Sequence, residues 1–365
     1  MLYILLNNTY HITDLEKYLN TETVSQITYI TVPVQLDSSL IRLPNIQLPA
    51  INVKELIRNY WAAKYKIAQI KKSIKPNNDD TLIVFSEIQL SNQIVIQEFS
   101  KAKAKVFLIE DGTATPILFN TQLQGSDAKS ILLKFFLQYV IGFPDIRVTN
   151  HDNGYFYHMA DKIFSGVIQF SEYSIKRNIK QYKLHSRPTA LSFSKNTNNC
   201  IFFNQHLYQV YVDFETFMHE LDKIINALVK KFDKVYFKFH PNEKREDVVK
   251  IKKILSQKYV IEYTDIKNNV DLISLNLTYG VSFISTVLRE LNYYGLKPIY
   301  LYHLFPNLCP VELNDNYTNY LNQSGYSFLP SLEELEIYCE TETFFKTIGS
   351  TNSIELFNID NCIND

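Results

Sequence analysis

The chain has 365 residues, more than one hydrophobic core usually organises, so we expect two domains. It carries 37 Lys and Arg against 38 Asp and Glu, a balance that argues against a nucleic-acid partner, because nucleic acid selects strongly basic surfaces. Its four cysteines show no C-x-x-C spacing and its first residues show no signal-peptide pattern, so we expect reduced thiols and a cytoplasmic location.

The first half of the chain alternates strand-like and helix-like patterns. Short apolar runs typical of buried parallel strands occur at residues 2–6, 27–32, 81–86 and 105–110. A helical pattern covers residues 53–74, between the second and third of these runs. The apolar segment 130–143 predicts a core helix rather than a membrane-surface helix, because Lys134 and Gln138 give it only a narrow polar face. The order of elements predicts a doubly wound unit over residues 1–190.

The alternation restarts after a polar, irregular stretch at residues 181–199 that is typical of a linker. The expected elements are strand 200–205, helix 214–232, strand 234–239, a helix from about 246, strands 259–264 and 277–282, helix 285–295, strand 297–302 and helix 331–347. We therefore expect a second unit over residues 191–365. The predicted fold class is α/β, with two tandem Rossmann-like domains and a cleft between them. This layout resembles that of two-domain glycosyltransferases of the GT-B type.

Several motifs of nucleotide-dependent enzymes are missing from the sequence. No G-x-G-x-x-G follows a predicted strand and no G-x-x-x-x-G-K-[ST] occurs, which disfavours dinucleotide oxidoreductases and P-loop enzymes. No two aspartates are separated by a single residue, so a D-x-D metal motif is also missing. We therefore expect neither a metal nor another cofactor.

The first group of residues suited to chemistry is Glu110-Asp111-Gly112, which follows a buried strand. Gly112 permits a tight turn, and a carboxylate at a strand tip can accept the proton of a sugar hydroxyl. The alternative is an ordinary turn, in which Asp111 and Gly112 reverse the chain and Glu110 is only solvated.

The second group is His240-Pro241, at the end of the predicted strand 234–239. Pro241 cannot donate to a strand ladder, so the strand ends there and His240 lies at a carboxyl edge, where ligands of open α/β sheets bind. An imidazole at this edge can hydrogen-bond a phosphate or protonate a leaving phosphate oxygen. The alternative is a histidine that only caps the strand.

The third group spans the end of the predicted strand 277–282 and the start of the following helix, and contains a glycine and three hydroxyl residues. It consists of Gly280, Ser282, Ser285 and Thr286. Hydroxyls and unpaired N–H groups at a helix start suit a phosphate or a carboxylate. The alternative is ordinary N-capping by Ser285 or Ser282.

These three groups, in this order, resemble the motifs of the bacterial sialyltransferases: a D/E-D/E-G motif, an H-P motif at a strand end and a downstream Ser-Ser/Thr motif. The matching residues are Glu110-Asp111-Gly112, His240-Pro241 and Ser285-Thr286. The resemblance covers roughly residues 105 to 300. It is closest to glycosyltransferase family 52, which includes lipooligosaccharide, O-antigen and capsule sialyltransferases, with the family 38 polysialyltransferases next.

The resemblance implies an inverting, metal-independent transfer of sialic acid from CMP-sialic acid to a hydroxyl of a cell-surface glycan. Glu110 would be the general base, with Asp111 as the alternative, and His240 would stabilise or protonate the departing phosphate of CMP. The residues implied in donor binding are Gly112, Gln205, Pro241, Gly280, Ser282, Ser285 and Thr286. The first domain would hold the acceptor and the second the donor.

The resemblance also implies contact with the cytoplasmic face of the inner membrane and a homodimer. Two other functions stay open. A teichoic-acid-type CDP-polyol phosphotransferase would explain His240 and Ser285 but not the group at residues 110–112. A non-catalytic module that binds a nucleotide or a glycan would keep the fold without the chemistry.

Overall fold

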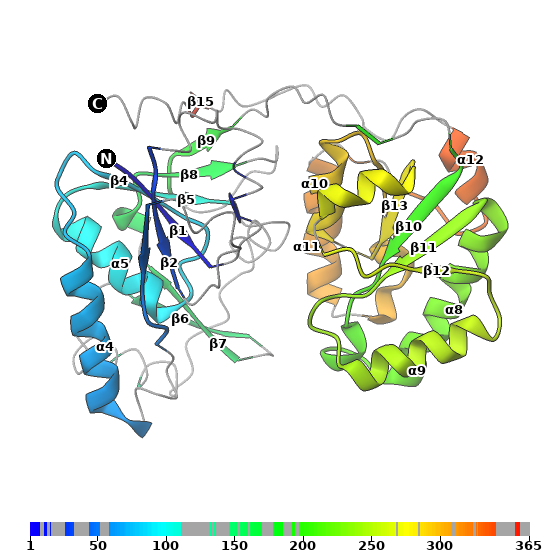
Figure 1. Cartoon of the computed structure of the whole chain (residues 1–365), viewed down its shortest axis with the longest axis horizontal. Helices are drawn as coiled ribbons and strands as arrows, with labels where there is room; N and C mark the ends of the chain where they lie inside the picture. The colour runs from blue at the N-terminus through cyan, green and yellow to red at the C-terminus, as the bar shows by residue number, and fades with distance from the viewer. Residues whose placement is uncertain are drawn as a thin grey trace.

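We describe the fold from a computed structural model of the chain. The residues that the structure describes are 1–7, 11, 12, 15, 26–32, 44–51, 58–110, 132, 135, 146–151, 154–159, 161–169, 178–184, 192–193, 197–267, 269–283, 285–308, 311–323, 326, 328–340 and 355–357. They form two α/β bodies, each built around one parallel sheet (Figure 1). A separate antiparallel pair joins β6 (Ile146–His151) and β7 (Gly154–Met159).

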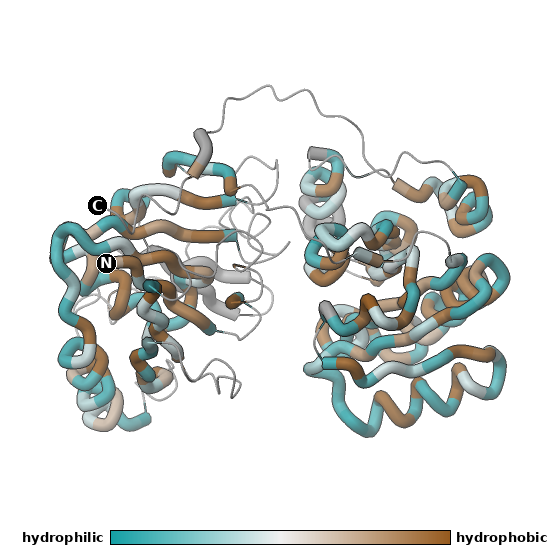
Figure 2. The backbone as a smooth tube through the Cα atoms, turned by 45° about the horizontal axis from the view of Figure 1, so that its top comes forward, coloured by the Kyte–Doolittle hydropathy of each residue, from teal (hydrophilic) through white to brown (hydrophobic). Residues whose placement is uncertain are grey.

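The first sheet has eight strands in the order β15-β9-β8-β5-β4-β1-β2-β3, and all of its pairs are parallel. The strands are β1 (Leu2–Leu6), β2 (Thr28–Thr31), β3 (Asn45–Gln47), β4 (Thr81–Val84), β5 (Lys105–Ile109), β8 (Gly166–Gln169), β9 (Gln181–Lys183) and β15 (Glu355–Leu356). The central strands are almost entirely apolar, as parallel strands covered on both faces require (Figure 2).

Two helices, α4 (Tyr60–Ser73) and α5 (Leu90–Lys101), accompany this sheet, with a 3-10 turn η2 (Asp161–Ile163). The side chains of Ile70 and Phe99 belong to the same buried cluster as Val84 of β4. Of the segment 130–143, which we expected to form a core helix, only Leu132 and Phe135 are described, and both side chains are exposed.

The second sheet has five parallel strands in the order β12-β11-β10-β13-β14. The strands are β10 (Asn199–Phe203), β11 (Lys234–Lys238), β12 (Glu262–Tyr263), β13 (Tyr279–Ser282) and β14 (Lys297–Tyr300). The helices are α8 (Phe214–Lys231), α9 (Arg245–Ser256), α10 (Thr286–Asn292), α11 (Val311–Gln323) and α12 (Leu335–Glu340), with 3-10 turns η3 (Leu207–Gln209), η4 (Asn269–Leu275), η5 (Tyr302–Leu304) and η6 (Pro306–Leu308).

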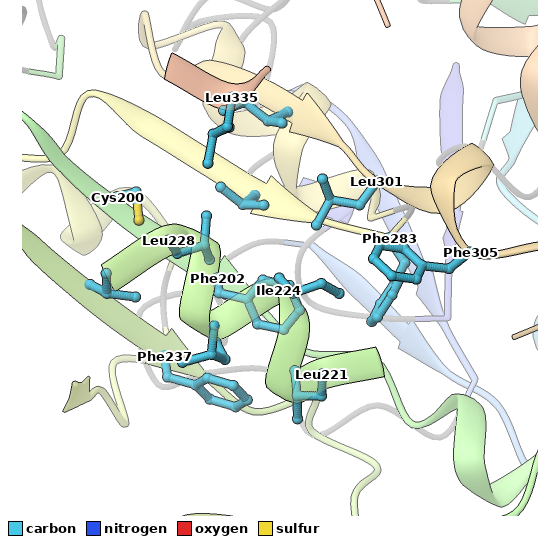
Figure 3. Close-up of a cluster of buried hydrophobic side chains, with 14 of the residues drawn as sticks. Cys200, Phe202, Leu221, Ile224, Leu228, Phe237, Phe283, Leu301, Phe305 and Leu335 are labelled. Atoms are coloured by element: carbon cyan, nitrogen blue, oxygen red, sulfur yellow. The ribbon is translucent and has the colours of Figure 1, made fainter. Parts of the chain in front are cut away.

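Helix α8 shows how the second core is built. Asp213 caps its first turn, because the Asp213 carboxylate accepts the backbone N–H of Thr216 at 2.9 Å. Its buried residues recur every three or four positions, which gives one apolar face toward the sheet. Figure 3 shows Leu221, Ile224 and Leu228 of this face packing among aromatic rings of the strands.

Two of the four cysteines, Cys200 and Cys339, are described, and both are buried free thiols of this core. Burial raises the pKa of the Cys200 thiol well above its usual value, which keeps the thiol protonated and unreactive. Both thiols are reduced, as expected from their spacing.

In each sheet the chain winds outward in both directions from a central pair of strands, β1 and β4 in the first and β10 and β13 in the second. The prediction of two Rossmann-like, doubly wound α/β units is therefore confirmed. The position of the domain boundary, near residue 190, stays a prediction. Strand β15, which we had assigned to the second domain of residues 191–365, instead pairs with β9 of the first sheet, because a parallel edge was open there.

Candidate functional site

The carboxyl edge of the second sheet is the expected place for a ligand, because β10 and β13 form its switch point. Three of the candidate residues lie there: Gln205 just after β10, His240 just after β11, and Ser282 at the end of β13. Pro241 follows His240 in an exposed turn. Strands that are far apart in sequence thus bring the candidate residues of the second domain to one edge.

His240 is a neutral histidine held in one tautomer. Its Nδ1 accepts the backbone N–H of Asn242 at 3.2 Å, so the proton of the neutral ring lies on Nε2. Burial, with the nearby charges of His206 and Lys238, lowers the pKa of His240 to about 4. The rings of His206 and His240 lie 4.4 Å apart, centroid to centroid. At neutral pH His240 is therefore suited to donate a hydrogen bond rather than to carry a charge.

The carboxylate of Glu243 fixes this histidine, and we did not predict its role. Its Oε1 accepts the backbone N–H of His240 at 2.8 Å, and both of its oxygens accept Nδ2 of Asn204 at 3.1 Å. The hydroxyl of Tyr208 donates to Oε2, also at 3.1 Å. Glu243 thus joins the ends of β10 and β11 to η3. Burial raises the pKa of Glu243, and the hydrogen bonds from these three donors oppose that rise.

A sequence signal for Glu243 was present in the stretch His240-Pro241-Asn242-Glu243. The Glu243 N–H donates back to the carbonyl of His240 at 3.1 Å, so the two residues form a reciprocal pair of bonds. The three-residue spacing is that of a capping box, but His240 caps no helix: the two residues close a turn before α9, whose N-cap is Lys244.

Replacing Glu243 with Ala should cost about 2–4 kcal/mol of unfolding free energy, because three buried or partly buried donors lose a charged acceptor together. Urea unfolding of the full chain measures the loss. The matched control is Glu262→Ala, which removes a surface pair with Lys234 (3.2 Å) and should change the unfolding free energy by less than about 0.5 kcal/mol. Equal losses for the two variants would contradict the role given to Glu243.

The hydroxyl residues after β13 already have partners within the chain. Ser282 is fully buried and its hydroxyl donates to the carbonyl of Phe203 at 2.9 Å, which joins β13 to β10. The Oγ of Ser285 accepts the backbone N–H of Val287 at 3.3 Å, so Ser285 is the N-cap of α10. Capping uses the hydroxyl oxygen as an acceptor, and the hydroxyl proton of Ser285 remains a donor group.

Gly280 lies within β13 and not after it. A Cβ added there would lie 2.5 Å from Cδ2 of Leu296 and 2.7 Å from Cδ2 of Leu288, so glycine allows α10 to pack closely against the strand. This is a packing role, and the expected donor-binding role of Gly280 stays a prediction.

Glu110 follows β5 at the carboxyl edge of the first sheet and is fully buried, unlike the solvated turn residue of the alternative interpretation. Its Oε1 accepts Nη1 of Arg289 at 2.5 Å, and the Arg289 side chain is only 13% exposed. Arg289 belongs to α10, which faces the first body in Figure 1. The pair joins the two domains. Asp111 and Gly112 lie outside the described residues.

Arg289 is a second residue that we did not predict. It lies three and four positions after Thr286 and Ser285, which puts the three side chains on neighbouring positions of α10. Two buried tyrosines, Tyr320 of α11 and Tyr326, feel the charges of both Arg289 and Glu110, and burial raises the pKa of both phenols. An arginine one turn after a Ser-Thr pair was the available signal.

No group of three or more His, Cys, Asp or Glu side chains able to hold a metal ion occurs among the described residues. Within the same part of the chain, no helix is long and apolar enough to cross a membrane.

Comparison with protein families gives one match that covers most of the chain. Residues 22–303 match the alpha-2,8-polysialyltransferase (POLYST) family. The chain belongs to this family. A polysialyltransferase family was the second of the two resemblances found in the sequence; the first, to family 52, is not confirmed. The protein is therefore a sialyltransferase-like glycosyltransferase.

Solved structures similar to this polysialyltransferase-family chain are glycosyltransferases and related proteins. MurG of Acinetobacter baumannii is 8% identical with a TM-score of 0.46, over 94% of this chain and 91% of MurG. MnaA of S. aureus, solved with UDP, is 10% identical with a TM-score of 0.44, over 88% and 90%. The wall teichoic acid polymerase TagF, H444N variant, is 12% identical with a TM-score of 0.43, over 96% and 85%. No curated protein sequence matches significantly.

Proposed function

We propose that the protein transfers sialic acid from CMP-sialic acid to a hydroxyl of a cell-surface glycan, with inversion and without a metal. Membership of the alpha-2,8-polysialyltransferase family supports the sugar and a 2,8 linkage, and hence an acceptor that ends in sialic acid. The observation that carries the proposal further is the pairing of Glu110 with Arg289, because it joins the proposed base to the helix that begins with Ser285 and Thr286.

In the proposed reaction the Glu110 carboxylate takes the proton of the acceptor hydroxyl, whose oxygen bonds to the anomeric carbon of sialic acid. The bond between that carbon and the phosphate oxygen breaks, and CMP leaves with the electron pair. Nε2–H of His240 and the hydroxyls of Ser285 and Thr286 would stabilise the negative charge on the phosphate. Gln205 and Ser282 would complete the donor side.

The proposed partners are CMP-sialic acid and the glycan acceptor. A cytoplasmic location, contact with the inner membrane and a homodimer are proposed with them. Asp111 stays the alternative base.

CMP should protect the protein from heat, and EDTA should not remove the protection. A ligand that binds only the native state stabilises it by about 3 kcal/mol at a hundredfold excess over its Kd. Scanning calorimetry with CMP, CDP and UMP, each with and without EDTA, measures the shift in Tm. A shift that disappears with EDTA contradicts metal independence, and a larger shift with CDP favours the polyol phosphotransferase.

Turnover separates an enzyme from a binding module. Release of CMP from CMP-sialic acid, assayed with galactosides, lactosides and sialosides as acceptors, should be fastest with sialosides. Binding of CMP without turnover of any acceptor would leave the non-catalytic module as the better explanation.

A further inference from the structure

Trp61 is the only tryptophan of the chain, and the structure leaves it 75% exposed on the outer face of α4. Tyr65, one turn later on the same helix, is 73% exposed. Tryptophan is highly buried on average in soluble proteins, because its large apolar surface is unfavourable in water. Two such side chains together on one helix face suggest a surface that is covered in the working protein.

The same face of α4 is positively charged. Four residues line one side of the helix, since their spacings of three, one and seven positions match its turns: Trp61, Lys64, Tyr65 and Lys72. Residues 58–78 contain no Asp or Glu and six basic residues, namely Arg58, Lys64, Lys66, Lys71, Lys72 and Lys75. We call Trp61, Lys64, Tyr65, Lys71 and Lys72 the aromatic-basic face.

Charge and aromatic surface are in direct contact on this face. Nζ of Lys64 lies 5.4 Å from the ring centroid of Trp61 and 5.8 Å from that of Tyr60, within the range of a cation–π contact. Lys66 has another role, since its Nζ donates to the carbonyl of Ala50 at 3.2 Å and ties the helix to the domain.

The buried residues on the opposite side of α4 keep the aromatic-basic face turned outward. Ala63 and Ile70 are fully buried in the first core, with Ile74 just after the helix. The helix cannot turn its aromatic-basic face inward without exposing these residues. In Figure 1, α4 lies on the side of the first body that points away from the second, so the second domain does not cover it.

We propose that the aromatic-basic face of α4 binds an anionic lipid surface. Trp and Tyr rings settle at the boundary between lipid head groups and acyl chains, and lysines beside them are attracted to anionic head groups. A second copy of the chain is a poor fit, because an isologous contact would oppose lysines to lysines. The proposal rests on the membrane contact of the proposed function and gives that contact a surface, but not on the transfer of sialic acid, so the binding and the transfer can fail separately.

Because Trp61 is the only tryptophan, its fluorescence reports on this face alone. The full chain is titrated with vesicles of phosphatidylcholine, with and without 30 mol% phosphatidylglycerol. We expect the emission to shift to shorter wavelength, and the protein to sediment with the vesicles, only when anionic lipid is present. Added salt should weaken the binding, since it screens the charges.

The test variant is Lys64→Glu with Lys72→Glu, which should lower vesicle binding roughly tenfold or more. The matched control is Lys230→Glu with Lys253→Glu, two exposed lysines of the second domain, which makes the same change in net charge elsewhere and should bind like the wild type. Sedimentation of Trp61→Ala, which should also bind more weakly, tests the aromatic contribution. All five positions are exposed, so the variants should fold, as circular dichroism can check.

Three results would overturn the proposal: no change of emission with anionic vesicles, equal binding by the test and control variants, or an emission that responds only to protein concentration. The last would identify a second copy as the occupant. An emission change with polyglutamate and none with vesicles would replace the membrane by an acidic protein.

Discussion

The Glu110→Gln protein should transfer sialic acid about 10²- to 10⁴-fold more slowly than the wild type, the usual contribution of a positioned base. Glutamine keeps the shape of the side chain and can still accept a hydrogen bond from Arg289, but it cannot take the proton of the acceptor hydroxyl. Steady-state kinetics with CMP-sialic acid and a sialoside acceptor measure the loss, which should appear in kcat.

The matched control for Glu110→Gln is Asp80→Asn. Asp80 is also a buried carboxylate of the first sheet in an ion pair, with the N-terminal amine of Met1 at 3.0 Å, but it lies just before β4, at the opposite edge. Asp80→Asn should lose stability and keep its turnover. Near-normal turnover of Glu110→Gln would reduce Glu110 to a structural residue. Loss of activity only in Asp111→Asn would move the base to Asp111.

A companion variant, Arg289→Gln, separates the ion pair from the base. It breaks the same contact between the domains but keeps the Glu110 carboxylate. Because the proposed base itself remains, Arg289→Gln should keep more transfer activity than Glu110→Gln, although both variants weaken the same pair. Steady-state kinetics of the two variants side by side make the comparison. Equal losses of kcat would contradict Glu110 as the proton acceptor.

Replacing His240 with Ala should weaken CMP binding roughly 10- to 100-fold and also lower the transfer rate. The reason is that a hydrogen bond to a charged group is worth about 1.5–3 kcal/mol, and the phosphate is present in both the ground state and the transition state. Isothermal titration with CMP measures the affinity. His219→Ala, on the outer helix α8, is the control and should bind CMP normally. Unchanged CMP affinity in His240→Ala would make His240 a strand cap only.

His240→Ala should also change how the free energy of unfolding depends on pH. The pKa of His240 is about 4 in the folded chain, against 6.5 for a free side chain, so the unfolded state takes up a proton first as the pH falls. The wild type should therefore lose stability between pH 6.5 and pH 4, and His240→Ala should lose less over that window. Urea unfolding at pH 7 and pH 5 makes the comparison, and identical losses would contradict a neutral His240.

Features that depend only on neighbouring residues, such as strand ends and helix caps, could be predicted from the sequence. The run before His240-Pro241 is a strand, β11, which ends at Lys238, one residue before the predicted end; proline cannot extend a ladder. The alternation of patterns likewise predicted the five strands of the second sheet, but only β1, β2, β4 and β5 of the eight strands of the first; β9 falls in the stretch 181–199 that we had assigned to a linker. Ser285 could be assigned as a possible cap because capping needs only the next few residues.

Contacts between residues far apart in the sequence could not be predicted from local patterns. Glu110 and Arg289 are separated by 179 positions, and nothing near either residue specifies the other. Glu243 receives donors from Asn204 and Tyr208, which only the packing of β10 beside β11 brings within reach. Strand β15 has two residues, too few for a periodic pattern, so its place in the first sheet could not be read from its sequence.

Because of strand β15, the first sheet can be completed only after the second domain has been synthesised. It pairs with β9, and the ring of Phe357 just after it packs against Phe107 at 4.8 Å and Tyr182 at 5.5 Å between centroids. The whole second domain is made before these residues leave the ribosome, so β9 stays an open edge while its neighbour folds. An open edge strand is a site for pairing with another chain. The second sheet is thus built from one continuous stretch of chain, whereas the first is assembled from two separate pieces.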